Sequence, residues 1–125
     1  MLKIFFHILN ILIIFLYLFP GSFLGCIFYD DCKLQPQITD DFIISSNHFF
    51  SFIILSFLGL YSFQFRVNQV VFYLIFLATI LEIFHLIIPN RSFELKDLFG
   101  NLIAVILSFI IFKILKVRRK NNEFF

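Results

Sequence analysis

The chain has 125 residues, of which 61% are hydrophobic and 14% are charged, and its formal net charge at pH 7 is +2. Soluble domains are about 45–50% apolar and about 25% charged, whereas the mean hydropathy of this chain is +0.98. Uncharged apolar stretches longer than about 18 residues indicate an integral membrane protein. The composition therefore excludes a soluble enzyme, a nucleic-acid-binding domain and a secreted disulfide scaffold.

Charged residues divide the chain into four apolar segments. They predict an all-α fold, an integral membrane four-helix bundle that forms a single domain over residues 1–125. Pro20 weakens the end of the first segment, and Pro89 ends the third. Each segment is long enough to cross a hydrocarbon core of about 30 Å, so the lipid bilayer is the expected partner. The expected helices cover about residues 4–24, 42–65, 70–88 and 98–115.

The basic residues predict the orientation of these helices. Lys3 precedes the first segment, Arg66 lies between the second and the third, and five basic residues crowd the C-terminal end. Basic residues mark the cytoplasmic side of a membrane protein. The connection between the first two segments carries four Asp residues against Lys33, so we expect it to face outward. Both termini should therefore be cytoplasmic.

The N-terminal segment has two alternative interpretations. Its basic start and apolar run resemble a signal peptide, and residues 23–26 faintly resemble a lipoprotein cleavage box. The run exceeds the usual 7–15 apolar residues of a signal peptide, so we expect an uncleaved first helix. Cys26 and Cys32 lie six positions apart near its outer end. Either a local disulfide or two free thiols fits that spacing.

Several polar side chains occur where a membrane should reject them. Glu82 lies in the third segment about 10 Å from Pro89, where an ionised carboxylate costs several kcal/mol unless it is paired, protonated or hydrated. Arg91 is the nearest strong donor, and an ion pair with Glu82 is the expected structural role of both. The fourth segment carries one stripe of short side chains, made of Asp97, Asn101, Ala104 and Ser108. We expect one polar patch, open to the outside, formed by His48, Glu82, His85, Arg91, Asp97 and Asn101.

The run from Glu82 to Asn101 resembles the signature of VanZ-like membrane proteins. That signature has a Glu, a polar residue three positions later, a Pro and an Arg, and then Asp and Asn four apart. His48 fits the His of the family's second helix. The chain departs from the pattern because His85 replaces the usual Gln, Ala104 and Ser108 replace preferred Gly residues, and Ile44-Ser45 replaces an Asp-Lys pair.

The resemblance implies a small four-helix protein of the bacterial cytoplasmic (inner) membrane. The family's namesake is associated with resistance to the glycopeptide teicoplanin, and no biochemical mechanism is established for the family. The leading hypothesis is a non-enzymatic protein of the cell envelope. Its polar patch would bind a cell-wall precursor, a lipid or a glycopeptide-type antibiotic; the sequence does not specify the ligand or the oligomeric state.

Two other classes of function fit parts of the sequence. Glu82 and His85 would serve a small proton-coupled transporter or transporter subunit. An intramembrane enzyme acting on a lipid-linked substrate would need a nucleophile beside His48, where Ser45, Ser46 and Ser51 lie. No elbow or triad pattern accompanies these serines, so we expect no catalytic residue and no enzyme activity.

Metal binding is a further alternative. Glu82 and His85 have the Glu-x-x-His spacing of carboxylate-bridged metals in helical bundles. Such sites need more carboxylates than this chain offers. We therefore expect no metal and no cofactor.

Overall fold

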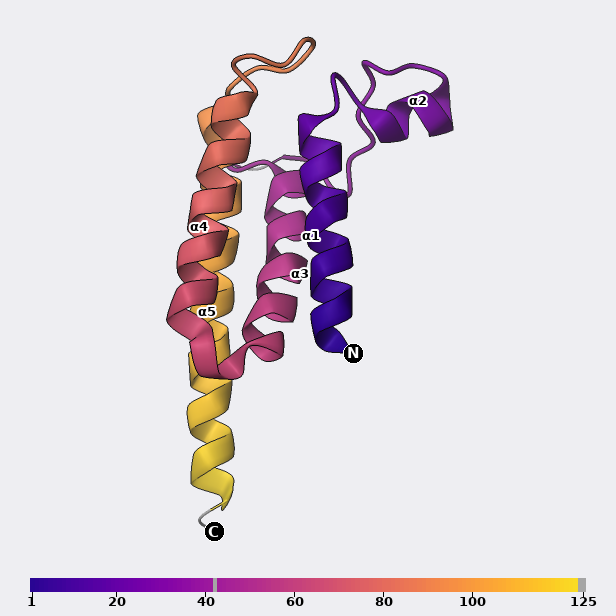
Figure 1. Ribbon diagram of the computed structural model, residues 1–125. Helices are drawn as coiled ribbons and strands as arrows, with labels where there is room; N and C mark the ends of the chain where they lie inside the picture. Colours follow the sequence, from indigo (N-terminus) through magenta and orange to yellow (C-terminus); the bar gives the residue numbers. More distant parts are fainter. Residues whose placement is uncertain (42, 124–125) are drawn as a thin grey trace.

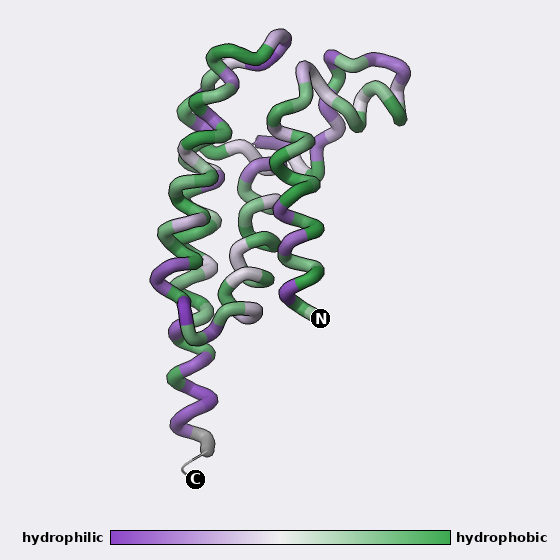
Figure 2. The backbone as a smooth tube through the Cα atoms, viewed as in Figure 1, coloured by the Kyte–Doolittle hydropathy of each residue, from purple (hydrophilic) through white to green (hydrophobic). Residues whose placement is uncertain are grey.

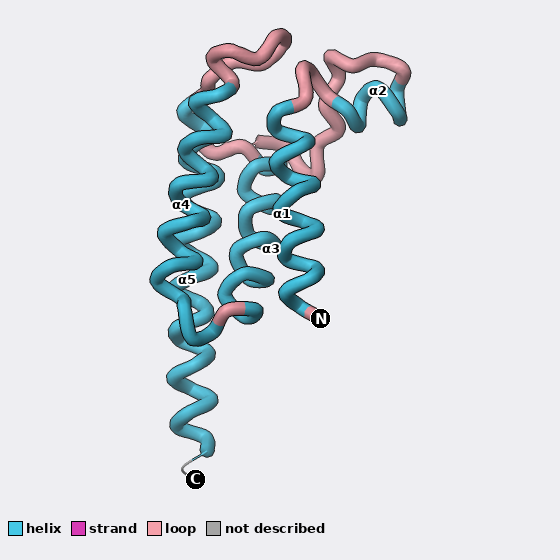
Figure 3. Tube along the Cα trace, viewed as in Figure 1, coloured by secondary structure: helices cyan, strands magenta, loops and turns pink. Residues whose placement is uncertain are grey.

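The computed structural model describes residues 1–41 and 43–123, and every regular element among them is helical (Figure 3). Five α-helices and one short 3₁₀ turn account for these elements. They are α1 Leu2–Leu18, α2 Phe23–Tyr29, α3 Ser46–Ser62, η1 Gln64–Arg66, α4 Val67–Phe84 and α5 Leu95–Glu123.

The four long helices α1, α3, α4 and α5 lie side by side, and α2 turns away from them (Figure 1). The described parts of the connections, residues 19–41, 43–45 and 85–94, lie at one end of the bundle, which we call the loop end (Figure 1). The N-terminus and η1 lie toward the opposite end, beyond which α5 extends alone (Figure 1). The last turns of α5 are hydrophilic, as Figure 2 shows.

The core lies where α3 packs against α1, α4 and α5. Buried side chains recur along α5 every three or four residues, as one face of a helix requires: Asn101, Ala104, Val105, Ser108 and Phe112. The predicted stripe of short side chains on this helix thus faces the interior. Gly59 of α3 allows equally close packing, since a Cβ there would lie 2.9 Å from a ring carbon of Phe6.

The outer faces of the helices carry large apolar side chains. Phe72 of α4 is 77% exposed and Ile11 of α1 is 67% exposed, which water would disfavour and lipid would not. Two helices are long and apolar enough to cross a membrane, Gln64–Phe84 with mean hydropathy 2.0 and Leu95–Asn121 with 2.4. The chain is thus a membrane protein with two candidate spans, and a third if α1 and α2 form one bent span.

The helix boundaries differ from the expected ones at the loop end. α1 stops at Leu18, and α2 follows at an angle of 83°. Phe19 is extended, as a residue before proline tends to be, and Gly21 has a φ of 96°, which favours glycine. α4 ends at Phe84, before the turns that lead to Pro89.

The predicted second helix is also shorter than expected. It begins at Ser46 and has 17 residues, which is about 26 Å of helix. It therefore lies at the lower limit of the length that spans a bilayer, and four full spans stay a prediction.

Candidate polar site at the loop end

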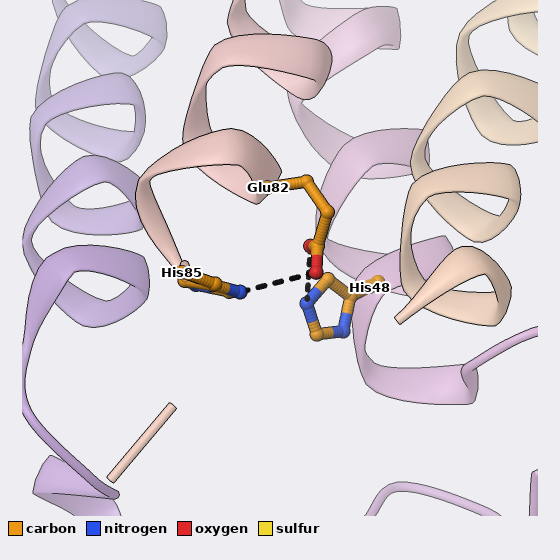
Figure 4. Close-up of side chains that lie close together, drawn as sticks. All are labelled: His48, Glu82 and His85. Carbon is orange, nitrogen blue, oxygen red and sulfur yellow. Dashed lines mark hydrogen bonds and ion pairs between the residues drawn. The ribbon is translucent and has the colours of Figure 1, made fainter. Parts of the chain in front are cut away.

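Three buried side chains meet between α3 and α4. Glu82 and His85 come from the last turn of α4 and its C-cap, and His48 comes from the first turn of α3 (Figure 4). His85 Nδ1 lies 3.2 Å from Glu82 Oε1, and His48 Nε2 lies 3.9 Å from Glu82 Oε2. The side chains of Glu82 and His85 are 0% and 1% exposed and that of His48 is 11% exposed, so the cluster is largely shielded from bulk water.

The proton on His85 is fixed by a contact with α1. His85 Nε2 lies 2.9 Å from the carbonyl oxygen of Tyr17, and a carbonyl only accepts hydrogen bonds. Nε2 therefore carries a hydrogen and donates it. In a neutral His85, Nδ1 then presents its lone pair to the Glu82 carboxylate. Two electron pairs repel each other, so the contact between Nδ1 and Oε1 is favourable only with a proton or a cation between these atoms.

His48 has partners on one side of its ring only. Its Nδ1 lies 3.1 Å from Ser45 Oγ and 3.7 Å from Asp97 Oδ1. Its Nε2 has no hydrogen-bond partner, and neither has Glu82 Oε2. The other carboxylate oxygen, Oε1, accepts a hydrogen bond of 3.1 Å from the backbone N–H of Glu94. Two unpartnered polar atoms thus face each other inside the cluster.

Tyr17 and Asn101 complete the buried network. The Tyr17 hydroxyl donates to Asn101 Oδ1 at 3.3 Å, and the Tyr17 ring stacks on His48 with 4.7 Å between ring centroids. Sequence analysis missed Tyr17. Phe6, Ile13 and Tyr17 recur with helical spacing and form the buried face of α1. This spacing could have indicated that Tyr17 is buried, but it does not show which residues Tyr17 contacts.

Arg91 does not form the expected ion pair with Glu82. Its guanidinium instead donates to the carbonyl oxygens of Leu16 (2.8 Å) and Phe19 (3.2 Å), at the C-terminal end of α1. A cation is favourable there because the last carbonyls of a helix are unpaired and carry partial negative charge. Burial lowers the pKa of Arg91 from its ordinary value, yet arginine stays charged in proteins.

A pocket of about 400 Å³ opens beside this network, lined by the end of α1, the starts of α2, α3 and α5, and the loops. His48, Arg91 and Asp97 line it, whereas Glu82, His85 and Asn101 lie buried behind its wall. The structure therefore places all six predicted residues in one region, but only three of them face the opening.

The charged lining of the pocket has more acids than bases. Arg91 and Lys96 face Asp41, Glu94 and Asp97, a formal balance of +2 and −3, or −1. Lys96 Nζ is paired with Asp41 Oδ2 at 3.1 Å and with Glu94 Oε2 at 3.5 Å. Both bases are thus engaged by the protein, which leaves the pocket suited to hydrogen-bond donors.

The serines near His48 do not make a catalytic triad with Asp97. Ser45 Oγ and Asp97 Oδ1 both approach Nδ1 of His48, whereas a triad places the nucleophile and the acid on opposite ring nitrogens. Ser46 Oγ instead donates to the Thr39 carbonyl at 2.6 Å. The geometry at this histidine is therefore not that of a Ser-His-Asp triad.

No protein-family model, curated protein or solved structure matches the chain. The VanZ-like resemblance therefore depends on the run from Glu82 to Asn101 and on His48.

Proposed function

We propose that this chain is a VanZ-like, non-enzymatic integral protein of the bacterial cytoplasmic membrane that binds an envelope ligand at its loop end. The observation that carries the proposal is the 400 Å³ pocket. It combines His48, Arg91 and Asp97 at one end of a bundle whose outer faces are apolar. A soluble ligand or a lipid headgroup would meet acidic, basic and imidazole groups together in this pocket.

The membrane arrangement that we propose has four crossings with both termini in the cytoplasm. α4 and α5 meet the length and hydropathy of membrane spans. α1 with α2, and the 17-residue α3, would complete the four, since spans as short as about 17 residues occur. The basic residues Lys3 and Arg66 and the C-terminal cluster support a cytoplasmic position for that end.

The lining of the pocket favours one ligand chemistry. Its charge balance is negative and its two bases are paired, which disfavours a free phosphate. Leu16, Phe23 and Leu24 add apolar surface. We therefore propose an amphiphile whose head carries ammonium or amide N–H groups, such as an aminolipid or the peptide part of a cell-wall precursor.

The test is a growth phenotype with matched variants. A deletion strain is complemented with the wild type, Asp97→Asn, or the control Asp40→Asn, which removes an exposed acid outside the pocket. We expect Asp97→Asn, and not Asp40→Asn, to lose tolerance of glycopeptides or detergents. Equal membrane levels of the three proteins must be shown by immunoblot. Full tolerance with Asp97→Asn would overturn the proposal.

Proton-coupled transport is a second candidate, supported by one observation. Asp97, His48 and Glu82 form a series leading inward from the pocket, with successive distances of 3.7 and 3.9 Å. Below it the described core is dominated by apolar side chains such as Leu74 and Ala78, so we rank it second. Proton flux into liposomes that Glu82→Gln abolishes would favour it.

A further inference from the structure

We propose that His48, Glu82 and His85 form a binding site for a single Zn²⁺ ion. The site does not depend on which ligand, if any, occupies the neighbouring pocket. Two histidines and one carboxylate are a recurrent protein ligand set for zinc. The three side chains come from two helices and meet in the interior (Figure 4).

The distances between the ligand atoms fit one ion. One nitrogen or oxygen from each residue lies within 4.8 Å of the others. Zinc binds nitrogen and oxygen at about 2.0–2.2 Å, which places the ligands of a tetrahedral ion roughly 3.3–3.6 Å apart. His85 Nδ1 lies 3.2 Å from Glu82 Oε1, and His48 Nε2 lies 3.9 Å from the other oxygen, Oε2. A rotation of the carboxylate with small side-chain shifts would bring one oxygen and both nitrogens around one ion.

The hydrogen bonds around the cluster leave the correct atoms free. His85 donates from Nε2 to the Tyr17 carbonyl, so Nδ1 directs its lone pair toward Glu82. His48 Nε2 and Glu82 Oε2 are buried without any hydrogen-bond partner. Buried polar atoms are rarely left unpaired, because each one costs free energy. One cation between the three side chains would satisfy all of these atoms.

Each proposed ligand also has an outer partner that holds its orientation. Metal-binding histidines usually contact a carbonyl, a carboxylate or another polar group through the second ring nitrogen. His85 contacts the Tyr17 carbonyl in this way, and His48 contacts Ser45 and Asp97 through Nδ1. The Glu94 N–H holds the Glu82 carboxylate. The contacts that pair these buried polar atoms thus also orient the three side chains toward one another.

The chemistry of the donors favours zinc over Ca²⁺ and Mg²⁺. Ca²⁺ and Mg²⁺ prefer sites made of oxygen atoms, whereas imidazole nitrogen suits zinc. A single ion needs no bridging carboxylate, so the shortage of acids that disfavours a two-metal site does not apply. Three protein ligands leave one tetrahedral position for water or another donor. The Gln usual at position 85 in the VanZ-like pattern would remove one ligand, so the inference concerns this chain.

The experiment measures zinc binding to the full chain in detergent micelles, purified with a tag that contains no histidine. The protein is stripped with a chelator and titrated with Zn²⁺ by calorimetry, and with Co²⁺ by visible absorption. Variants His48→Gln, Glu82→Gln and His85→Gln each remove one ligand. The matched control is His7→Gln, which alters the one other histidine of the chain, an exposed residue of α1.

We expect one Zn²⁺ per chain and the absorption of tetrahedral Co²⁺ for the wild type and His7→Gln. Each ligand variant should bind at least about 100-fold more weakly, since mutation of even an outer partner costs 10–100-fold. Zinc should also raise the Tm of the first two proteins but not of the ligand variants.

Two results would overturn the proposal: no saturable binding to the wild type, or unchanged binding in all three ligand variants. If the cluster instead holds only a shared proton, the wild type will show no saturable zinc binding. Circular dichroism and gel filtration establish which variants are folded. If Glu82→Gln is misfolded, His48→Gln decides, because His48 packs at the edge of the cluster beside the pocket.

Discussion

At the scale of single residues, Arg91 joins the two halves of the loop end. It lies in the connection between α4 and α5 but donates both of its hydrogen bonds to α1, 72 and 75 positions away in sequence. Its cationic group satisfies two carbonyls that the helix itself leaves unpaired. Arg91 therefore positions α1, and with it Tyr17, against the buried cluster.

We expect Arg91→Gln to lower the free energy of unfolding by about 2–3 kcal/mol, because hydrogen bonds to charged groups contribute about 1.5–3 kcal/mol. Arg91→Lys should lose about half as much, since lysine lacks the planar fork that reaches two carbonyls. Unfolding by titrated sodium dodecyl sulfate in mixed micelles measures both. The control Arg66→Gln, at an exposed turn, should change stability by less than about 0.5 kcal/mol. An unchanged Arg91→Gln protein would contradict this role.

Asp41 gives the loop end a dependence on pH. The backbone N–H of Ser46, 3.1 Å away, lowers the pKa of Asp41, and Lys96 adds to this effect. A carboxyl whose pKa is lowered on folding stabilises the protein above its unfolded pKa of about 3.9, and this stabilisation disappears as the pH falls through the folded value. The difference in stability between the wild type and Asp41→Asn should therefore be constant near neutral pH and shrink below about pH 4. Unfolding midpoints at a series of pH values measure it, and a difference that grows in acid would be the wrong sign.

At the scale of helices, local patterns predicted the all-helical fold and two candidate membrane spans, α4 and α5, while the other two expected spans stay predictions. The stripe that contains Asn101, Ala104 and Ser108 is buried, because a 3.6-residue period shows which face of a helix is inside. The break after Leu18 was expected only as a weakening at Pro20. A proline marks a disturbance, but the 83° turn of the chain depends on what α2 then contacts.

Contacts between distant segments are what local patterns could not supply. Tyr17 bonds Asn101 across 84 positions, and Arg91 bonds α1 instead of Glu82. The sequence showed that Glu82 needs a partner. It placed His48 and His85 in the same region, but it did not show that a backbone N–H and the end of α1 would also meet there.

A disulfide between Cys26 and Cys32 joins α2 to the loop that follows it. Of the two alternatives that the spacing allowed, a local disulfide and two free thiols, the structure has the disulfide. Gly25 packs against the carbonyl oxygens of Leu34 and Asp31 with no room for a Cβ. The disulfide and this packing hold the segment that continues into the pocket wall at Gln35.

Reduction should open this loop and lower stability by about 2 kcal/mol, the chain-entropy value for so short a loop. Limited trypsin digestion measures the opening directly, because Lys33 is the only Lys or Arg between Lys3 and Arg66. We expect faster cleavage after Lys33 in the reduced protein and in Cys26→Ser. The oxidised wild type is the control, and an equal cleavage rate in all three would show that packing alone holds the loop.

At the scale of the whole molecule, the different lengths of the helices determine where the polar site lies. α5 has 29 residues, whereas α1 and α3 have 17 each. α3 starts deeper in the bundle than the ends of α1 and α4 (Figure 1), and the pocket is lined by its first turns. A short, recessed helix thus leaves room for polar groups at the loop end, which in the proposed arrangement lies near the outer membrane surface.

The proposed orientation makes a prediction that separates a bent span from a re-entrant loop. Lys3 lies over the ring of Phe63, 5.4 Å from its centroid, so the N-terminus and the turn near Arg66 share one end of the bundle. Reporters inserted after Lys3, Arg66 and Arg119 should all give a cytoplasmic signal, and a reporter after Asp31 an outward one. An outward signal after Arg66 or Arg119 contradicts the topology.

A reporter after Asp31 that gives a cytoplasmic signal, with the other three unchanged, would show that α1 and α2 enter the membrane and return. The pocket could then not face outward, because α2 and the loop up to Gln35 form part of its wall. Binding of a ligand from outside the cell would then be excluded. The proposed zinc site would be unaffected, because its ligands come from α3 and the end of α4.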